Sequence, residues 1–235
     1  MRIGHLSALT LSIFGLLAGC GQDKTTAEGV EIIRIGSVAP LTGAQSHIGK
    51  DNDNGARLAI DEINAQGLIL AGKPVKLELV SEDDAADPKT ATNVAQKLVD
   101  QGVKAVIGHL NSGTTIPASK IYHDAGIPQI SPSATATAYT AQGYNTAYRV
   151  MANDAQQGKA LGQYAVARMG ARKVAIIDDR TAYGQGLADE FEKAATAAGA
   201  TVVAREYTSD KSTDFTAILT SIKGKAADLV FFGGM

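Results

Sequence analysis

Tryptophan is absent from the 235-residue chain, and Phe, Trp and Tyr together make up only 5% of it. Its 22 Lys and Arg residues are balanced by 24 Asp and Glu residues, which leaves a formal net charge of −2. A chain with no basic surplus and few aromatic rings lacks the phosphate contacts and the stacking platforms on which nucleic-acid binding depends. We therefore expect no nucleic-acid partner.

Cysteine occurs once, at Cys20, so an internal disulfide is excluded. Arg2 is followed by a largely apolar run from Leu6 to Leu17, which is the pattern of a signal peptide. This run is shorter than the roughly 18 to 20 apolar residues that a membrane-spanning helix needs, and no other segment approaches that length. We assign residues 1–20 to a signal peptide and expect a soluble mature body.

The apolar run ends in Leu17-Ala18-Gly19-Cys20, which matches the bacterial lipobox, where the cysteine receives a diacylglyceryl group. An ordinary secretory signal cleaved nearby is the alternative. We expect lipidation at Cys20, with acyl chains that hold the protein in the periplasm or cell envelope at a membrane surface. Residues 21–30, polar and without apolar periodicity, are then a short tether.

From residue 31 onward, short β-rich runs alternate with segments of 3.6-residue periodicity, which indicates an α/β fold with parallel sheets. The expected strands are Ile32–Val38, Val75–Val80, Ala105–Gly108, Pro128–Ile130, Ala147–Val150, Val174–Ile177, Thr201–Ala204 and Leu229–Phe232. Apolar stripes between them predict six helices, the fourth through Leu161, Tyr164, Ala165 and Met169. The stretch 131–145 shows no clear stripe, so we expect a crossover between two lobes there: lobe 1 at residues 31–143 and lobe 2 at residues 144–235.

Motifs for catalysis are missing: the sequence has no zinc motif, Walker loop or nucleophile elbow. The four histidines, His5, His47, His109 and His123, are scattered, so we expect no metal site and no cofactor. The acidic residues Glu82, Asp83, Asp84 and Asp87 lack the spacing of a calcium loop, and we interpret them as helix capping and a solvated loop. We expect no enzymatic activity.

Three strand-end segments carry candidate binding residues, because ligands of parallel α/β sheets bind beyond the carboxyl ends of the strands. Ser112 follows one strand and opens a helix whose free N–H groups favour a carboxylate, although it could also simply cap the helix. Ser131, Ser133, Thr135 and Thr137 offer hydroxyls without a nearby cation, which suits an ammonium group. Tyr183 occupies the corresponding place in lobe 2, where it either closes over a ligand or packs in the core.

Six motifs in collinear order resemble one known family, the branched-chain amino-acid-binding proteins. These are Gly36-Ser37-Val38-Ala39-Pro40-Leu41-Thr42-Gly43, Gly55-Ala56 with Asp61-Glu62-Ile63-Asn64, Asp83-Asp84 with Asp87-Pro88, Ile107-Gly108-His109-Leu110, Ser131-Pro132-Ser133-Ala134-Thr135 and Tyr183-Gly184-Gln185-Gly186. The resemblance implies a type I periplasmic-binding-protein fold and a monomeric receptor that delivers Leu, Ile or Val to ABC permease subunits in the membrane.

The resemblance also implies roles for individual residues. The ligand carboxylate falls to Ser112 and nearby N–H groups, and the ammonium to the Thr135 hydroxyl and the Ser133 carbonyl. Tyr183 approaches from lobe 2, and Asp154 supports the cleft. An aromatic residue that the family often has in its first loop is Ile48 here, which bears on side-chain selectivity.

The family continues well beyond Gly234, so we expect a C-terminally truncated chain with an incomplete second lobe. The sequence leaves two other functions open. One is a receptor for short amides, urea or aromatic acids, which the same fold accepts. The other is a sensory ligand-binding domain that signals to a partner protein.

Overall fold

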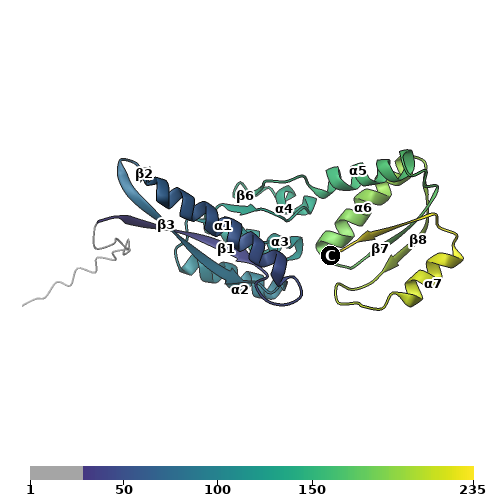
Figure 1. Cartoon of the computed structure of the whole chain (residues 1–235), viewed down its shortest axis with the longest axis horizontal. Helices are drawn as coiled ribbons and strands as arrows, with labels where there is room; N and C mark the ends of the chain where they lie inside the picture. Colours follow the sequence, from purple (N-terminus) through teal and green to yellow (C-terminus); the bar gives the residue numbers. More distant parts are fainter. Residues whose placement is uncertain (1–28) are drawn as a thin grey trace, which may run out of the picture.

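The computed structural model describes residues 29–235, which form two α/β lobes side by side (Figure 1). The predicted signal peptide, the lipidation site Cys20 and almost all of the predicted tether lie outside the described residues. None of the helices in residues 29–235 is long and apolar enough to cross a membrane.

Lobe 1 is built on a six-stranded sheet in the order β2-β3-β1-β4-β5-β6. Its strands are β1 (Glu31–Ala39), β2 (Leu68–Leu70), β3 (Lys73–Asp83), β4 (Ala105–Gly108), β5 (Gln129–Ser131) and β6 (Ala147–Arg149). Its helices are α1 (Ser46–Gln66), α2 (Pro88–Asp100), α3 (Ser112–Asp124) and α4 (Thr137–Ala141). Neighbouring strands are parallel except for the β2–β3 hairpin, so β1, β4 and β5 end at one edge of the sheet.

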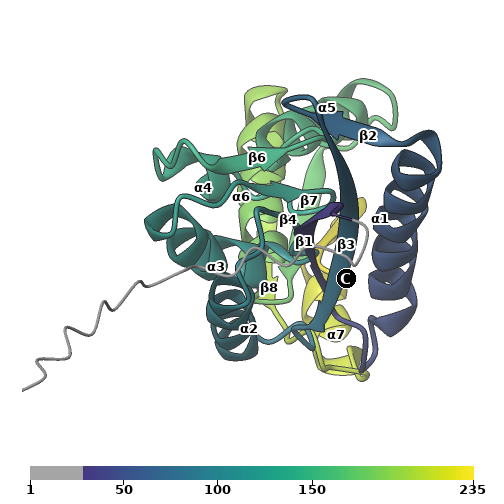
Figure 2. The same ribbon diagram turned by 90° about the vertical axis from the view of Figure 1, so that its left-hand side faces the viewer.

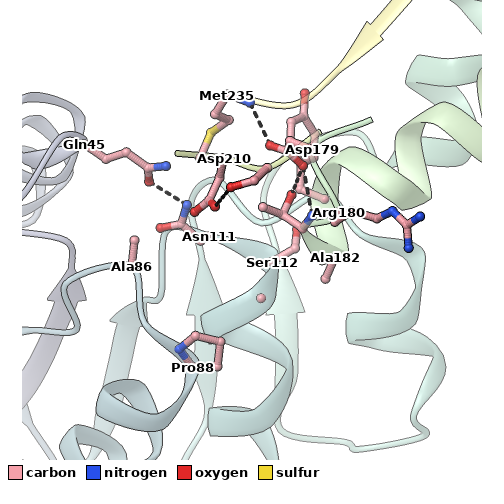
Figure 3. Close-up of a pocket in the computed structure, with 14 residues that line it drawn as sticks. Gln45, Ala86, Pro88, Asn111, Ser112, Asp179, Arg180, Ala182, Asp210 and Met235 are labelled. Atoms are coloured by element: carbon pink, nitrogen blue, oxygen red, sulfur yellow. Dashed lines mark hydrogen bonds between the residues drawn. The ribbon is translucent and has the colours of Figure 1, made fainter. Parts of the chain in front are cut away.

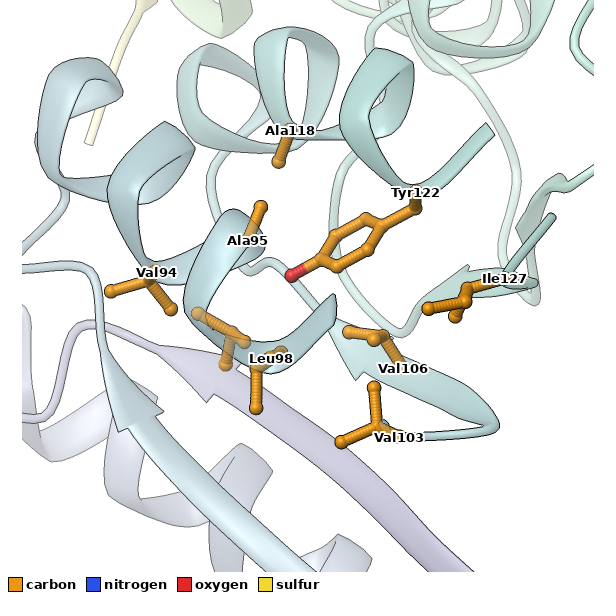
Figure 4. Packing of buried hydrophobic residues seen from close by; sticks show 9 residues of the cluster. Val94, Ala95, Leu98, Val103, Val106, Ala118, Tyr122 and Ile127 are labelled. Atoms are coloured by element: carbon orange, nitrogen blue, oxygen red, sulfur yellow. The ribbon is translucent and has the colours of Figure 1, made fainter. Parts of the chain in front are cut away.

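The core of lobe 1 lies between this sheet and the helices α2 and α3 (Figure 4). Leu98 of α2 and Tyr122 of α3 are fully buried against Val106 of β4. Helix α1 covers the opposite side of the sheet, so β1 is sandwiched between helices (Figure 2). Burial on both faces explains why the carboxyl-terminal half of β1 is fully buried and why the central strand β4 is a short apolar run.

Lobe 2 has a three-stranded parallel sheet in the order β8-β7-β9, formed by β7 (Lys173–Asp178), β8 (Thr201–Tyr207) and β9 (Leu229–Gly233). Helices α5 (Asp154–Ala167) and α6 (Ala182–Ala197) pack on one face, where the Phe191 and Phe231 rings stack 3.8 Å apart. Helix α7 (Thr216–Gly224) packs on the other face through Ile218 and Ile222. The expected α/β fold with two parallel-sheet lobes is therefore confirmed.

The point where the chain leaves lobe 1 corrects the sequence prediction. The strand β6 pairs in parallel with β5 in the six-stranded sheet, so residues 147–149 belong to lobe 1. The crossover is residues 150–153, between β6 and α5, rather than the stretch 131–145, and the expected boundary after residue 143 was placed too early. The error arose because a three-residue strand has too few positions to reveal its sheet, and that stretch also contains the short helix α4.

The apolar stripe predicted for the fourth helix, which is α5, was wrong at three of its four residues; only Ala165 is buried. Leu161, Tyr164 and Met169 are exposed, with 39%, 60% and 64% of their surface accessible. The buried face contains Gly158 and Gly162, which sit against the backbone of α6. A Cβ atom added at Gly162 would lie 2.7 Å from the Ala195 nitrogen, so this close helix contact requires glycine.

Candidate functional site

Two adjoining hollows lie where the strand ends of lobe 1 face lobe 2, and Figure 3 shows the larger of them. The larger has a volume of about 540 Å³ and the smaller about 190 Å³. They share Asn111, Ser112, Tyr183 and Met235, so they form one continuous cleft between the lobes. This position matches the rule that ligands of parallel sheets bind beyond the carboxyl strand ends.

Ser112 is the first residue of α3, directly beyond β4, and it is only 2% exposed. Its hydroxyl caps no N–H of its own helix; Oγ instead accepts a hydrogen bond from the Ala136 N–H at 3.1 Å. The N–H groups of Ser112 and Gly113 precede the first hydrogen bond of the helix, and both residues line the cleft. This helix start therefore presents N–H donors to the cleft, as an anion site requires.

The residues 131–136, here called the 131–136 loop, follow β5 beside Ser112. Fully buried Ser131 organises this loop: its hydroxyl donates to the His109 carbonyl at 2.7 Å and accepts from the Ala134 N–H at 2.9 Å. The Ser133 hydroxyl accepts from Asn52 of α1 at 2.8 Å. Ser133 and Thr135 line the smaller hollow. Ser131 does not, and its hydroxyl makes its hydrogen bonds within lobe 1.

Tyr183 reaches the cleft from the first turn of α6 in lobe 2 and lines both hollows. It is half-buried, and burial raises the pKa of its phenol. The structure thus brings together Ser112, Ser133, Thr135 and Tyr183 around one hollow, completed by the apolar residues Ile48 and Leu110. Their role in ligand binding stays a prediction.

Asp154 lies just behind this hollow, at the first position of α5. Asp154 is 1% exposed, and neither carboxylate oxygen has a well-formed hydrogen bond within residues 29–235, although the Thr135 hydroxyl lies close to it. Burial raises the pKa of Asp154, and the nearby Thr135 hydroxyl and Arg149 offset this only in part. A buried carboxylate with unused acceptors is energetically unfavourable unless a cation or donor approaches it.

The sequence interpretation missed several residues of the larger hollow. Asn111 donates from Nδ2 to the Gln45 side chain at 2.7 Å, which joins the β4–α3 turn to the loop after β1. In lobe 2, the buried Asp179 accepts from the Thr181 N–H and from the Met235 N–H. Asp179 directly follows β7, so the strand-end rule used for Ser112 would have found it.

The acidic cluster behaves only partly as expected. Asp87 caps α2, where its carboxylate accepts from the Thr90 N–H at 2.7 Å. Asp84, however, is fully buried: its Oδ2 lies 2.8 Å from Nδ1 of His109, whose Nε2 lies 3.2 Å from the Tyr122 hydroxyl. The interpretation as a solvated loop was therefore wrong for Asp84. Residues 29–235 contain no group of three or more His, Cys, Asp or Glu residues placed to hold a metal ion.

Comparison with known proteins adds independent evidence. Residues 32–235 match the family model described as periplasmic binding protein. A Leu/Ile/Val-binding protein of Rhizobium johnstonii is 40% identical over 86% of this chain and 54% of its own length. The Leu/Ile/Val-binding protein of Escherichia coli is 37% identical over 93% of this chain and 59% of its own length. The chain thus spans little more than half the length of these relatives.

Solved structures of transporter binding proteins have a similar fold. A branched-chain amino-acid transporter substrate-binding protein of Streptococcus pneumoniae, solved with isoleucine, matches with a TM-score of 0.75 and 36% identity over 85% of this chain and 56% of its own. A solute-binding protein of an ABC transporter from R. palustris, solved with benzoate, matches with a TM-score of 0.76 and 26% identity. The match covers 87% of this chain and 55% of that protein.

Proposed function

Because the chain belongs to the periplasmic binding protein family, whose type I fold its two lobes share, we propose that it is the solute receptor of an ABC transporter. We propose further that it captures branched-chain or related aliphatic amino acids between its lobes, without catalysis, and delivers them to permease subunits. Relatives described as Leu/Ile/Val-binding proteins support this ligand class.

One observation carries the proposal: the smaller hollow combines the three environments that an aliphatic amino acid needs. A helix start at Ser112 suits the carboxylate, the hydroxyl-bearing 131–136 loop suits the ammonium, and Ile48 and Leu110 form an apolar wall for the side chain. A ligand that carries all three groups fits this arrangement better than one that carries only a carboxylate.

Each predicted residue then has a chemical role. Ser112 donates its hydroxyl to the carboxylate alongside the N–H groups of the helix start. The Thr135 hydroxyl and the Ser133 carbonyl accept from the ammonium, and the buried Asp154 behind them supplies negative charge. Tyr183 closes over the ligand from lobe 2 when the lobes approach by hinge motion.

The cellular context is a proposal of the same kind. We place the protein in the periplasm or cell envelope, anchored by lipid at Cys20, as a monomer that docks on its permease and has no nucleic-acid partner. Metabolic labelling with a clickable palmitate tests the anchor: a Cys20→Ser variant is expected to lose the label and to leave the membrane fraction.

Isothermal titration calorimetry on the full-length protein tests the ligand class. L-Leucine, L-isoleucine and L-valine are expected to bind, whereas urea, acetamide and benzoate are expected to give no heat. Binding of an amide or of urea with no response to any amino acid would overturn the proposal.

A receptor for aromatic acids is the second candidate, because the R. palustris relative was solved with benzoate. A helix start that binds a carboxylate would serve benzoate equally well. The unpaired, buried Asp154 close to Thr135 favours a cationic group in the ligand and so favours an amino acid. The same titration separates the two candidates.

A further inference from the structure

Three consecutive carbonyl groups of the 131–136 loop are held by the two ends of the crossover between the lobes. Arg149, the last residue of β6, donates from Nη1 to the Ala134 carbonyl at 2.8 Å and from Nη2 to the Ala136 carbonyl at 2.7 Å. The N–H of Asp154, the first residue of α5, donates at 2.9 Å to the carbonyl between them, that of Thr135. Only residues 150–153 separate these donors, so the loop is hydrogen-bonded to both ends of the crossover.

The surroundings of Arg149 are unusual for an arginine at a strand end. Its side chain is half-buried, lies 5.3 Å from the centre of the Tyr139 ring, and donates to the Thr140 hydroxyl at 3.0 Å. Arg149 makes no ion pair with any carboxylate in the described part of the chain. The planar guanidinium fork instead fixes two carbonyls on either side of Thr135, which a single flexible ammonium could not do.

We propose that Arg149 is a positioning residue for ligand binding: it fixes Thr135 for the ligand ammonium and couples the 131–136 loop to the interlobe crossover. This inference rests on the proposed function, since it takes Thr135 as a ligand contact. Arg149 does not line either hollow, so it acts through the loop and not through the ligand.

Both halves of the binding site depend on this clamp. The Ala136 N–H donates to the Ser112 hydroxyl, and the Ala136 carbonyl accepts from Arg149. A shift of Ala136 therefore disturbs the proposed carboxylate contact at Ser112 as well as the ammonium contact at Thr135. Residues 149 and 154 bracket the crossover, so rotation of lobe 2 about residues 150–153 acts directly on the loop.

The first test compares substitutions at Arg149 in the full-length protein by calorimetry with L-leucine, L-isoleucine and L-valine. Arg149→Met is expected to raise Kd by about tenfold or more, since two charge-assisted hydrogen bonds to the loop are lost. Arg149→Lys is expected to fall between Met and wild type, because an ammonium replaces only part of the fork. Arg168→Met, at the exposed end of α5, is the matched control and is expected to bind as wild type does.

A double-variant cycle distinguishes positioning from a general structural role. If Arg149 acts through the 131–136 loop, then Arg149→Met combined with Thr135→Ala raises Kd by clearly less than the product of the two single-variant fold-changes, because both substitutions remove the Thr135 contact. Fold-changes that simply multiply would overturn the inference. If the Met variant does not fold, Arg149→Lys replaces it in the same cycle with the same criterion.

Hydrogen–deuterium exchange on the ligand-free protein gives a readout that is independent of which solute binds. The Arg149 variants are expected to exchange faster in peptides covering residues 131–136, with unchanged exchange in the core of α2 and α3. Unaltered exchange in the loop would refute the clamp even where the wild type binds amino acids. A wild type that binds no amino acid, with faster loop exchange in the variants, would refute the proposed function and leave the clamp standing.

Discussion

Two serines on the lobe 1 side of the cleft, Ser112 and Ser133, differ from Asp154 on the lobe 2 side in how far their side chains are already hydrogen-bonded. On the lobe 1 side, Ser112 and Ser133 both make hydrogen bonds to lobe 1 itself. On the lobe 2 side, Asp154 has two buried carboxylate oxygens without a well-formed hydrogen bond in residues 29–235. Tyr183 stands half-buried at the cleft surface.

This difference separates a preorganised side from a side that completes its contacts later. The lobe 1 groups are held in place before ligand binding, so little conformational entropy is lost there when a ligand docks. The lobe 2 groups gain most from a partner that arrives, because an unpaired buried carboxylate is costly. For the proposed receptor, this difference predicts that a solute contacts lobe 1 first and that Asp154 gains its partner only afterwards.

The largest expected effect is on the free energy of unfolding. It compares a largely buried arginine of lobe 2 with an exposed arginine of lobe 1. Arg205 of lobe 2 lies 2.9 Å from the fully buried Asp178, and its ion pairs with Asp178 and Asp189 raise its pKa although burial opposes this. Arg205→Met is expected to lower the free energy of unfolding by about 3 kcal/mol, because Asp178 stays buried without its cation. Urea denaturation monitored by circular dichroism measures this.

Arg57→Met in lobe 1 is the matched control. Its side chain is 51% exposed and pairs with Asp53 one helical turn away, so a loss of only about 0.5 kcal/mol is expected. Burial would raise the pKa of Asp53, but hydrogen bonds from Ser81, Ser37 and Arg57 outweigh this and lower it. Equal losses for the two arginines would contradict the contrast between the lobes.

Ser112→Ala probes the preorganised side. It removes the proposed donor to the ligand carboxylate and the acceptor of the Ala136 N–H, so Kd for leucine is expected to rise about tenfold, or roughly 1.4 kcal/mol. Ser119→Ala is the control, because Ser119 is also buried in α3 but bonds to Ile116 and Gln142 away from the cleft. Calorimetry in which both variants bind alike would remove Ser112 from the site.

Asp154→Asn probes the side that completes its contacts later. Because burial raises the pKa of Asp154 above its ordinary value of 3.8, the native state binds this proton more tightly than the unfolded chain does. Ionisation therefore destabilises the ligand-free protein as pH rises from 3.8 through the native pKa, and the penalty persists at neutral pH. The Asn variant is expected to be more stable by about 1 kcal/mol at pH 7, yet to bind leucine more weakly.

Thermal unfolding at several pH values checks the first part of that prediction and calorimetry the second. The stability gain is expected to vanish below about pH 3.8, where both states are protonated. Asp210→Asn, an exposed carboxylate that also lines the cleft, is the charge-matched control. A gain in stability without any loss of affinity would show that Asp154 does not serve the ligand.

The smallest expected effect is also on the free energy of unfolding, and it concerns the N-cap of α5, the helix that begins directly after the crossover. Asn153 caps α5 by accepting from the Gln156 N–H at 3.1 Å, and the Gln156 side chain reaches back to the Asn153 N–H. Asn153→Ala is expected to cost about 0.5 to 1 kcal/mol in the free energy of unfolding, with unchanged leucine selectivity. Denaturant titration of this variant beside Gln156→Ala, which removes the other half of the box, measures it.

Short sequence patterns predicted the edge of the lobe 1 sheet that faces the cleft. The strand Ala105–Gly108 was predicted with its observed bounds, and the strand-end rule then located Ser112 beside the 131–136 loop. Both results follow from apolar runs and parallel-sheet geometry, which short stretches of sequence contain. The resemblance to a known family singled out Ser133 and Thr135 among four hydroxyl-bearing residues already proposed, and it added Asp154.

Features that depend on distant pairing could not be predicted. The strand β2 has three residues, with Ile69 60% exposed, so it carries no readable alternation. The Asp84–His109 contact joins residues 25 positions apart. The stripe of α5 misled because periodicity gives weight to large apolar side chains, whereas the real interface uses Gly158 and Gly162.

That glycine interface has a mechanical consequence. Backbone of α6 lies so close to Gly158 and Gly162 that the two helices cannot slide without a clash, and a stack of Phe191 on Phe231 fastens α6 to the sheet beneath. Asp154 opens α5 and Tyr183 stands in the first turn of α6. Helices α5 and α6 therefore move as one rigid unit: a rotation of lobe 2 about residues 150–153 changes the distance of the Tyr183 phenol from lobe 1, whereas Asp154, hydrogen-bonded to Thr135 beside the crossover, stays close to its place.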